Sequence, residues 1–170
     1  MFEGDKFGNF IIHRLRGEEE DKLKTSLNIP YGGYLNSAGI KLIDSAHYYV
    51  GETITSLEKC VLNPGGAEVI IYSTIFGGIG VFYPLKNRED VDFFVHLETH
   101  MRQNAPPIAG RRHIDFRSSY FPVKNCVDGD LCEQFGSMSR DVQKHITSEM
   151  VMKDPNTIKK RIEILRSHII

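Results

Sequence analysis

The feature that most constrains the fold is a change in the spacing of apolar residues near residue 86. Up to Leu85, short runs alternate apolar and polar residues, which is typical of half-buried β-strands. From Asn87 onward, apolar residues recur every three or four positions, which is typical of helices that bury one face. The sequence therefore predicts an α+β fold, with strands in residues 1–86 and helices in residues 87–170.

Five short strands are expected in the first part, paired antiparallel in the order of a meander. They cover residues 7–15, 41–50, 52–62, 68–76 and 80–85. Gly51 bends or divides the chain between two of them, whereas Asn63–Gly66 and Gly77–Gly78 supply tight turns, because proline fixes φ and glycine accepts positive φ. Nothing here closes the sheet or covers both its faces. We therefore expect unpaired edges, and we expect the isolated 170 residues to associate or to be poorly soluble.

A polar stretch, residues 16–41, interrupts these strands and has the composition of a long exposed loop. Its acidic run, Glu18–Asp21, is most simply a solvated face, with a docking tail as the alternative. The basic run Lys159–Arg161 near the end of the chain has the same two interpretations, either a solvated helix face or a basic patch for a partner.

Three helices are expected in the second part from their caps and apolar stripes. The first begins at Asn87 and ends before Pro106–Pro107, since proline lacks the amide hydrogen that a helix interior needs. The second begins after Ser139, and the third begins after Asp154, which a proline follows at the first helical position. Their stripes are expected to form a core rather than to contact a cofactor.

Two motifs suggest chemistry but have simpler interpretations. His96 and His100 lie four residues apart on one helix face and could share a metal, but Glu98 lies about 200° away from the first histidine, unlike the glutamate of H-E-x-x-H zinc proteases. Asp128 and Asp130 form the only prominent carboxylate pair, and they precede an amphipathic run, so helix capping explains them better than a metal site does.

Composition limits the possible functions further. The 21 basic and 22 acidic residues leave a net charge of −1, which gives no reason to expect nonspecific attraction to nucleic acid. The three cysteines form no C-x-x-C pair, so neither a disulfide framework nor a thiolate zinc site is predicted, and a reducing compartment is expected. No apolar run approaches the length of a membrane-spanning helix.

In the strand-to-helix transition, residues 111–137, the amino-acid identities are more informative than the spacing of apolar residues. The segments Arg117–Asn125 and Val127–Phe135 strongly resemble the C-terminal region of the splicing factor 3B subunit 3 family. Supporting matches are Gly4–Asn9, Tyr49–Thr53, Asn63–Gly66, Gly77–Gly80 and Asp92–Phe94. Residues 16–40 and the last helix match loosely. The wider family includes the damage-specific DNA-binding subunit that serves as a cullin ubiquitin-ligase adaptor and the largest cleavage and polyadenylation specificity subunit.

The resemblance implies a nuclear, noncatalytic scaffold in pre-mRNA splicing that binds no cofactor. It implies that residues 1–86 are terminal strands of a β-propeller and that residues 87–170 are a C-terminal helical domain. Implied partners are the helical-repeat subunit 1 and the small subunit 5 of the splicing factor 3B complex and the U2 snRNP, with RNA contact indirect or minor. A cullin-ligase or polyadenylation adaptor, and more remotely a metalloenzyme using His96 and His100, are the alternatives.

The same transition supplies the candidate site residues, which are expected either to hold the junction of strands and helices or to face a partner. They are Arg117, Tyr120, Phe121, Asp128, Asp130 and Glu133.

Overall fold

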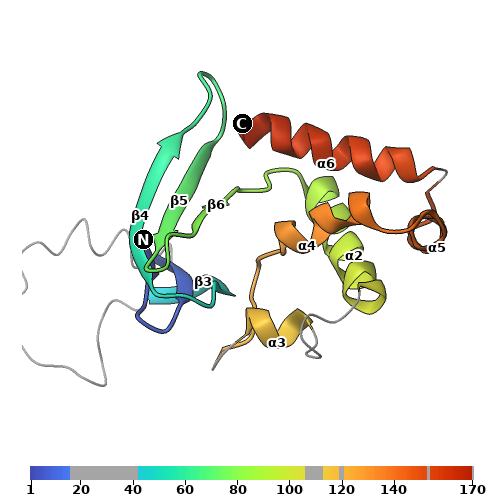
Figure 1. The fold of residues 1–170 in the computed structure, drawn as a ribbon. Coiled ribbons are helices and arrows are strands. Elements are labelled where there is room, and N and C mark those ends of the chain that lie inside the picture. The colour runs from blue at the N-terminus through green and yellow to red at the C-terminus, as the bar shows by residue number, and fades with distance from the viewer. Residues whose placement is uncertain (16–41, 106–112, 119–120, 153, 170) are drawn as a thin grey trace, which may run out of the picture.

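A computed structural model describes residues 1–15, 42–105, 113–118, 121–152 and 154–169. Two small antiparallel sheets are followed by a group of helices beside them (Figure 1). The predicted α+β class is therefore confirmed. The predicted loop over residues 16–41 and the pair Pro106–Pro107 lie outside the described residues.

Within the described ranges, each sheet has three strands. The first sheet has the order β1 (Phe2–Gly4), β2 (Asn9–Leu15) and β3 (Leu42–Tyr49), and the second has β4 (Ile54–Val61), β5 (Glu68–Thr74) and β6 (Ile79–Phe82). The prediction that all the strands form a single sheet is wrong, because the chain leaves the first sheet at the Gly51 bend and starts a second sheet. The predicted hairpin turns between β4 and β5 and between β5 and β6 are confirmed.

Strand β1 was not predicted, and the strand expected from Phe7 begins at Asn9. The reason is a tight turn between β1 and β2, in which Asp5 Oδ1 accepts the backbone N–H groups of Phe7 and Asn9 at 2.9 and 2.8 Å. Gly8 has a φ of +92° there, and a Cβ on it would lie 2.7 Å from the backbone nitrogen of Glu52. The turn of the first sheet thus packs closely against the start of the second.

Aromatic side chains join the two sheets. The ring of Phe10 on β2 stacks on Phe82 of β6 with centroids 3.9 Å apart. Tyr48 of β3 and Tyr72 of β5 contact the same Phe82 ring at 5.7 and 5.1 Å. The sheets therefore share a small aromatic core rather than each having its own.

The helices follow in chain order after β6. They are α2 (Arg88–Asn104), α3 (His113–Arg117), α4 (Gly129–Glu133), a 3₁₀ turn (Gln134–Ser137), α5 (Arg140–Glu149) and α6 (Pro155–Ile169). Helix α3 was not predicted. Within the described part of the chain, no helix is both long and apolar enough to cross a membrane.

Side-chain caps begin three of these helices as predicted. Asp128 Oδ1 accepts the Leu131 N–H at 3.2 Å, Ser139 Oγ accepts the Val142 N–H at 3.5 Å, and Asp154 Oδ1 accepts the Asn156 N–H at 3.1 Å. Asn87 occupies the cap position of α2, but its side chain makes no capping hydrogen bond.

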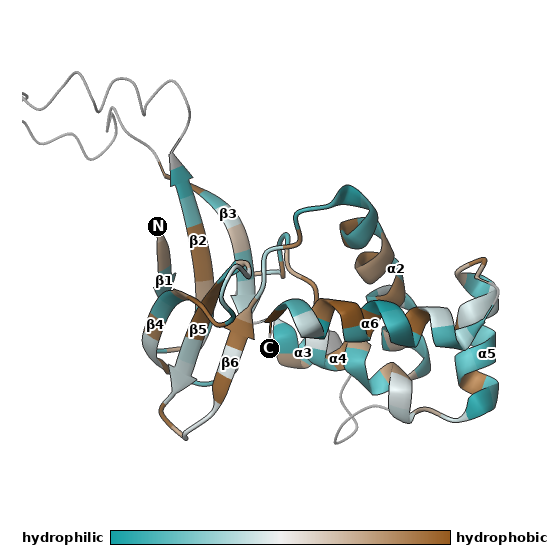
Figure 2. Ribbon diagram, turned by 90° about the horizontal axis from the view of Figure 1, so that it is seen from above, coloured by the Kyte–Doolittle hydropathy of each residue, from teal (hydrophilic) through white to brown (hydrophobic). Residues whose placement is uncertain are grey.

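The helices surround one apolar cluster. Its buried members are Phe93, Phe94, Leu97, Met101, Leu131, Cys132, Phe135, Ile146, Ile158 and Ile162. The apolar stripes of α5 and α6 supply Ile146, Ile158 and Ile162, as predicted. On α2 the apolar residues Val91 and Val95 are exposed, and Phe93 is buried. Figure 2 shows these helices grouped to one side of the sheets, with apolar stretches along α6.

Candidate interaction site at the junction of sheets and helices

Arg117, the last residue of α3, connects both parts of the molecule. Its Nε donates to Asp128 Oδ2 at 2.7 Å and its Nη2 donates to Asp130 Oδ2 at 3.1 Å. Its guanidinium also lies over the ring of Tyr48 on β3, 5.3 Å from the ring centroid. One cation on α3 therefore contacts both the first sheet and the start of α4, and three of the candidate residues, Arg117, Asp128 and Asp130, lie together.

A third carboxylate, Glu98, extends this network to α2. The backbone N–H of Asp128 donates to Glu98 Oε1 at 3.1 Å, and Arg102 Nη2 donates to the same oxygen at 2.7 Å. The Asp128 and Glu98 side chains are 1% and 7% exposed. Burying a charge is costly unless it is paired and hydrogen-bonded, and both carboxylates meet that condition.

The network changes the proton affinity of its members. Burial, then the charge of Asp128, raises the pKa of the Tyr48 phenol far above its ordinary value, and a hydrogen bond to Asp128 adds to this. Burial disfavours the charged form of Arg117, but Tyr48, Asp128 and Asp130 together outweigh it and raise the pKa of the guanidinium. Burial, then the charge of Glu98, raises the pKa of the Cys126 thiol to about 11. Near neutral pH the Tyr48 phenol and the Cys126 thiol therefore stay uncharged, whereas the Arg117 guanidinium stays positively charged.

The segment after α3 runs along the edge of β3. The backbone groups of Lys124 and His47 exchange two hydrogen bonds, both of 2.9 Å. Lys124 Nζ also donates to the Asp44 carbonyl at 2.5 Å, and Asn125 Nδ2 donates to the Ser45 carbonyl at 2.7 Å. The expected unpaired edge of the first sheet is therefore partly covered by this chain's own transition segment.

The remaining candidate residues have separate positions. Phe121 is 55% exposed, and its ring meets His47 edge-on at 5.3 Å. Glu133 accepts from Arg166 of α6 at 3.1 Å between Oε2 and Nη2. Tyr120 lies outside the described residues. Phe121, Glu133 and Asp130 thus have surface available, in contrast to Asp128 and most of Arg117.

Sequence reasoning missed two members of the network, Glu98 and Tyr48. A signal for Glu98 was present, because it lies four residues after Phe94 and three before Met101 on the buried face of α2. A charged residue in an apolar stripe indicates a buried ion pair. No signal identified Tyr48, since its partners come from segments about 70 to 80 residues further along the chain.

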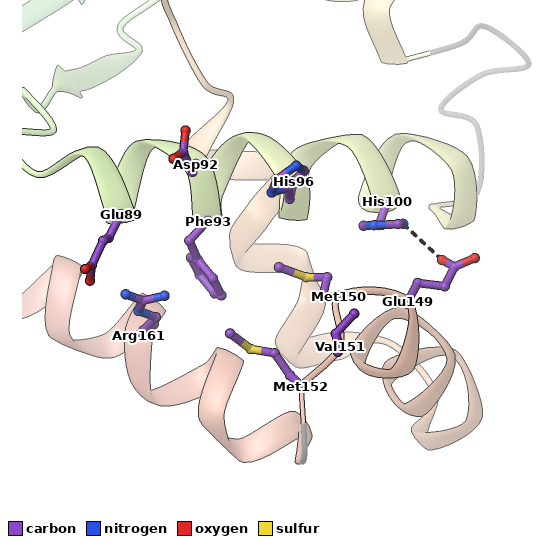
Figure 3. A pocket seen from close by; sticks show the side chains of 10 residues that line it. All are labelled: Glu89, Asp92, Phe93, His96, His100, Glu149, Met150, Val151, Met152 and Arg161. Atoms are coloured by element: carbon purple, nitrogen blue, oxygen red, sulfur yellow. Dashed lines mark ion pairs between the residues drawn. The ribbon is translucent and has the colours of Figure 1, made fainter.

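The second place where polar groups gather is a hollow beside α2 (Figure 3). His96 and His100 both line it, but His100 Nδ1 pairs with Glu149 Oε2 at 3.0 Å. Among the residues that the structure describes, no group of three histidine, cysteine, aspartate or glutamate side chains is placed to hold a metal ion.

Comparison with known proteins adds to this geometry. The family described as the CPSF A subunit region matches residues 1–137. Splicing factor 3B subunit 3 of Danio rerio is 44% identical over 98% of this chain, spliceosome-associated protein 130 A of Arabidopsis thaliana is 44% identical over all of it, and pre-mRNA-splicing factor RSE1 of Mycosarcoma maydis is 42% identical over 95%. The chain spans 14% of the length of each of these relatives. The matches confirm the resemblance inferred from the sequence.

Proposed function

The chain belongs to the CPSF A subunit family, and we propose from this that it is part of a noncatalytic scaffold protein of pre-mRNA splicing. The observation that carries the proposal is the identity of 42–44% to splicing proteins from an animal, a plant and a fungus over at least 95% of the chain. The buried network at the junction is consistent with this role, because it fixes shape and offers no exposed reactive group. The proposed function needs neither a cofactor nor a small-molecule substrate.

The proposed architecture of the complete protein extends beyond these residues. Residues 1–86 would be terminal strands of a β-propeller, and residues 87–170 would be a helical domain that packs against them. The two open three-stranded sheets and the much greater length of the relatives support this proposal. Propeller blades hide their edges against neighbouring blades, which would protect the exposed edges of β4 and β6.

The proposed partners are the helical-repeat subunit 1 and small subunit 5 of the splicing factor 3B complex, together with the U2 snRNP in the nucleus. Contact with RNA would be indirect or minor, because the net charge of −1 provides no excess of cations for phosphates. At the junction, we assign the holding role to Arg117 and Asp128. The partner-facing role then falls to Phe121, Asp130 and Glu133, which have exposed surface. Tyr120, which directly precedes Phe121 in the sequence, stays a candidate for either role.

Purification of the tagged full-length protein from nuclear extract tests this proposal. We expect the branch-site complex to copurify, identified by mass spectrometry. Recovery of a cullin ligase or of polyadenylation factors in its place would contradict the splicing assignment.

A matched pair of variants tests the partner-facing role of the junction. Phe121 and Phe7 are the same residue type and are 55% and 56% exposed, but Phe7 lies in the turn between β1 and β2. We expect Phe121→Ser to reduce the recovery of splicing partners and Phe7→Ser to leave it unchanged, at equal amounts of purified protein. Equal recovery with both variants would remove Phe121 from the proposed surface.

A further inference from the structure

A hollow of about 530 Å³ opens between α2 and the connection from α5 to α6. Phe93, which is buried, and the half-buried Met150 and Met152 form its apolar interior, and their side chains gather in the centre of the view in Figure 3. This volume lies within the range of about 300–1,000 Å³ that is typical of ligand pockets. The proposed scaffold role of the junction does not use these residues.

Val151, on the rim of the hollow, has an unusual backbone. The Met152 N–H donates to the Thr147 carbonyl at 3.0 Å and the Val151 N–H donates to the Ser148 carbonyl at 3.1 Å, which together form a Schellman motif at the end of α5. Val151 takes the left-handed position of that motif with a φ of +56°. Glycine is the usual residue there, and a β-branched residue is strained. The chain thus holds a strained valine whose side chain is 92% exposed.

The polar part of the rim is predominantly acidic. Glu89 and Asp92 are exposed on α2, and Glu149 lies at the opposite end of the hollow. Among the described residues that line the hollow, Arg161 is the one side chain that is always positively charged. It already contacts Asp90 at 3.6 Å and the ring of Phe93 at 4.6 Å. Glu149 is shared between His100 and His145. Arg88 Nε lies 3.9 Å from Asp92 Oδ2, so the charge of Asp92 is already paired. Glu89 makes no ion pair with any residue that the structure describes, and it leaves a negative charge beside the apolar interior.

We propose that this hollow docks a segment of a partner protein that inserts one leucine, methionine or phenylalanine beside Met150 and Met152 and places a lysine or arginine near Glu89. Thioether side chains adapt to different apolar shapes, which suits such an anchor. A second copy of this chain is a poorer occupant, because a two-fold contact centred on the hollow would bring the same acidic rim against itself. The inference rests on the proposed function only in that a scaffold holds other proteins.

Selection from a random 12-residue peptide library displayed on phage, with the immobilised full-length protein as the target, tests this proposal without any splicing extract. We expect the selected peptides to combine one large apolar residue with lysine or arginine a few positions away. Enrichment of acidic peptides, or no enrichment, would overturn the proposal. A failure here leaves copurification with splicing proteins unaffected, so the two proposals can fail separately.

A selected peptide, synthesised with a fluorescent label, then locates the site by anisotropy. Val151→Gly removes the exposed side chain and relieves the positive φ, so we expect affinity to fall by about tenfold while the thermal midpoint stays the same or rises. Ile164→Ala, which removes an exposed apolar side chain of α6 outside the hollow, should bind like the unaltered chain. Equal affinity of the Val151→Gly chain would contradict the proposal.

Charge reversal tests the acidic rim separately. We expect Glu89→Lys to weaken binding of the same peptide by about tenfold, and the matched Glu163→Lys, on the exposed face of α6, to leave it unchanged. Equal loss of affinity with both variants would mean that only the net charge of the chain affects binding, and it would overturn the proposed arrangement. A Val151→Gly chain that changes from dimer to monomer in sedimentation would instead identify the hollow as a contact between copies and would also overturn it.

Discussion

The sheets and the helices of this chain bury apolar residues to different extents. The helices enclose a continuous cluster with Leu97, Met101 and Phe135 fully buried, whereas the sheets share a few aromatic rings around Phe82 and leave Phe76 and other large apolar side chains exposed. The difference indicates that the helices have a core of their own within the described residues. The sheets depend more on what covers them.

The sharpest test of this comparison makes the same substitution in each part. Phe135 in the helical core is 0% exposed, and Phe76 at the β5–β6 turn is 84% exposed. We expect Phe135→Ala to lower the free energy of unfolding by about 3–5 kcal/mol and Phe76→Ala to change it by less than about 0.5 kcal/mol. Urea unfolding followed by circular dichroism measures both. Similar losses from the two variants would show that the β5–β6 turn is packed in solution.

The second test breaks the connection between the two parts. Asp128→Ala removes a buried carboxylate and leaves Arg117 without its main partner, so we expect a loss of about 3 kcal/mol in unfolding free energy. Asp130, which contacts the same guanidinium, is 82% exposed, and Asp130→Ala should cost less than about 1 kcal/mol. Near-equal costs would mean that the Arg117–Asp128 pair contributes no more than a surface contact.

Much of the fold could be predicted from local pattern, because local pattern determines local structure. The turn residues and the caps Asp128 and Ser139 act within a few positions of the sequence, and both hairpins and both helix starts were correct. The division into two sheets and the existence of β1 depend on contacts between distant segments. Gly80 illustrates this limit, because a Cβ there would lie 2.2 Å from the Tyr72 ring, a requirement that only the folded hairpin reveals.

The candidate site shows the same contrast between residues that local sequence identifies and residues that only distant contacts bring together. Arg117, Asp128 and Asp130 are candidates because they lie in one segment that resembles a known family. The structure places their three side chains together. Glu98 was considered only as a metalloprotease residue, although its place on the apolar face of α2 indicated a buried partner. Tyr48 could not be found, since its contact with Arg117 exists only after the first sheet and α3 have packed.

Alkaline pH tests whether the junction is dry in solution. The Cys126 thiol has a pKa of about 11 in the folded chain against 9.0 ordinarily, so it contributes stability that is fully present below pH 9 and is lost as pH rises from about 9 to 11. Between pH 8.5 and 10.5 this contribution should fall by about 2 kcal/mol. We expect the Cys126→Ala chain to lose correspondingly less stability over that interval in urea titrations. The same loss in both chains would show that water reaches the thiol.

The smallest expected effect on stability accompanies a large effect on association. Ile75, Phe76 and Ile79 are 61%, 84% and 78% exposed around the β5–β6 turn, beside the open edge of β6. Because apolar side chains next to an unpaired strand edge favour pairing with other chains, we expect the isolated chain to be polydisperse in light scattering. The double variant Phe76→Lys with Ile79→Lys should shift it toward the monomer, with a change in unfolding free energy of only about 0.5 kcal/mol.

As a control, Val91→Lys alters an apolar residue that is 37% exposed on α2 and should leave association unchanged. A monodisperse unaltered chain would mean that the sheets are better protected than their exposed surface indicates, and equal effects of the two variants would reduce the result to added charge.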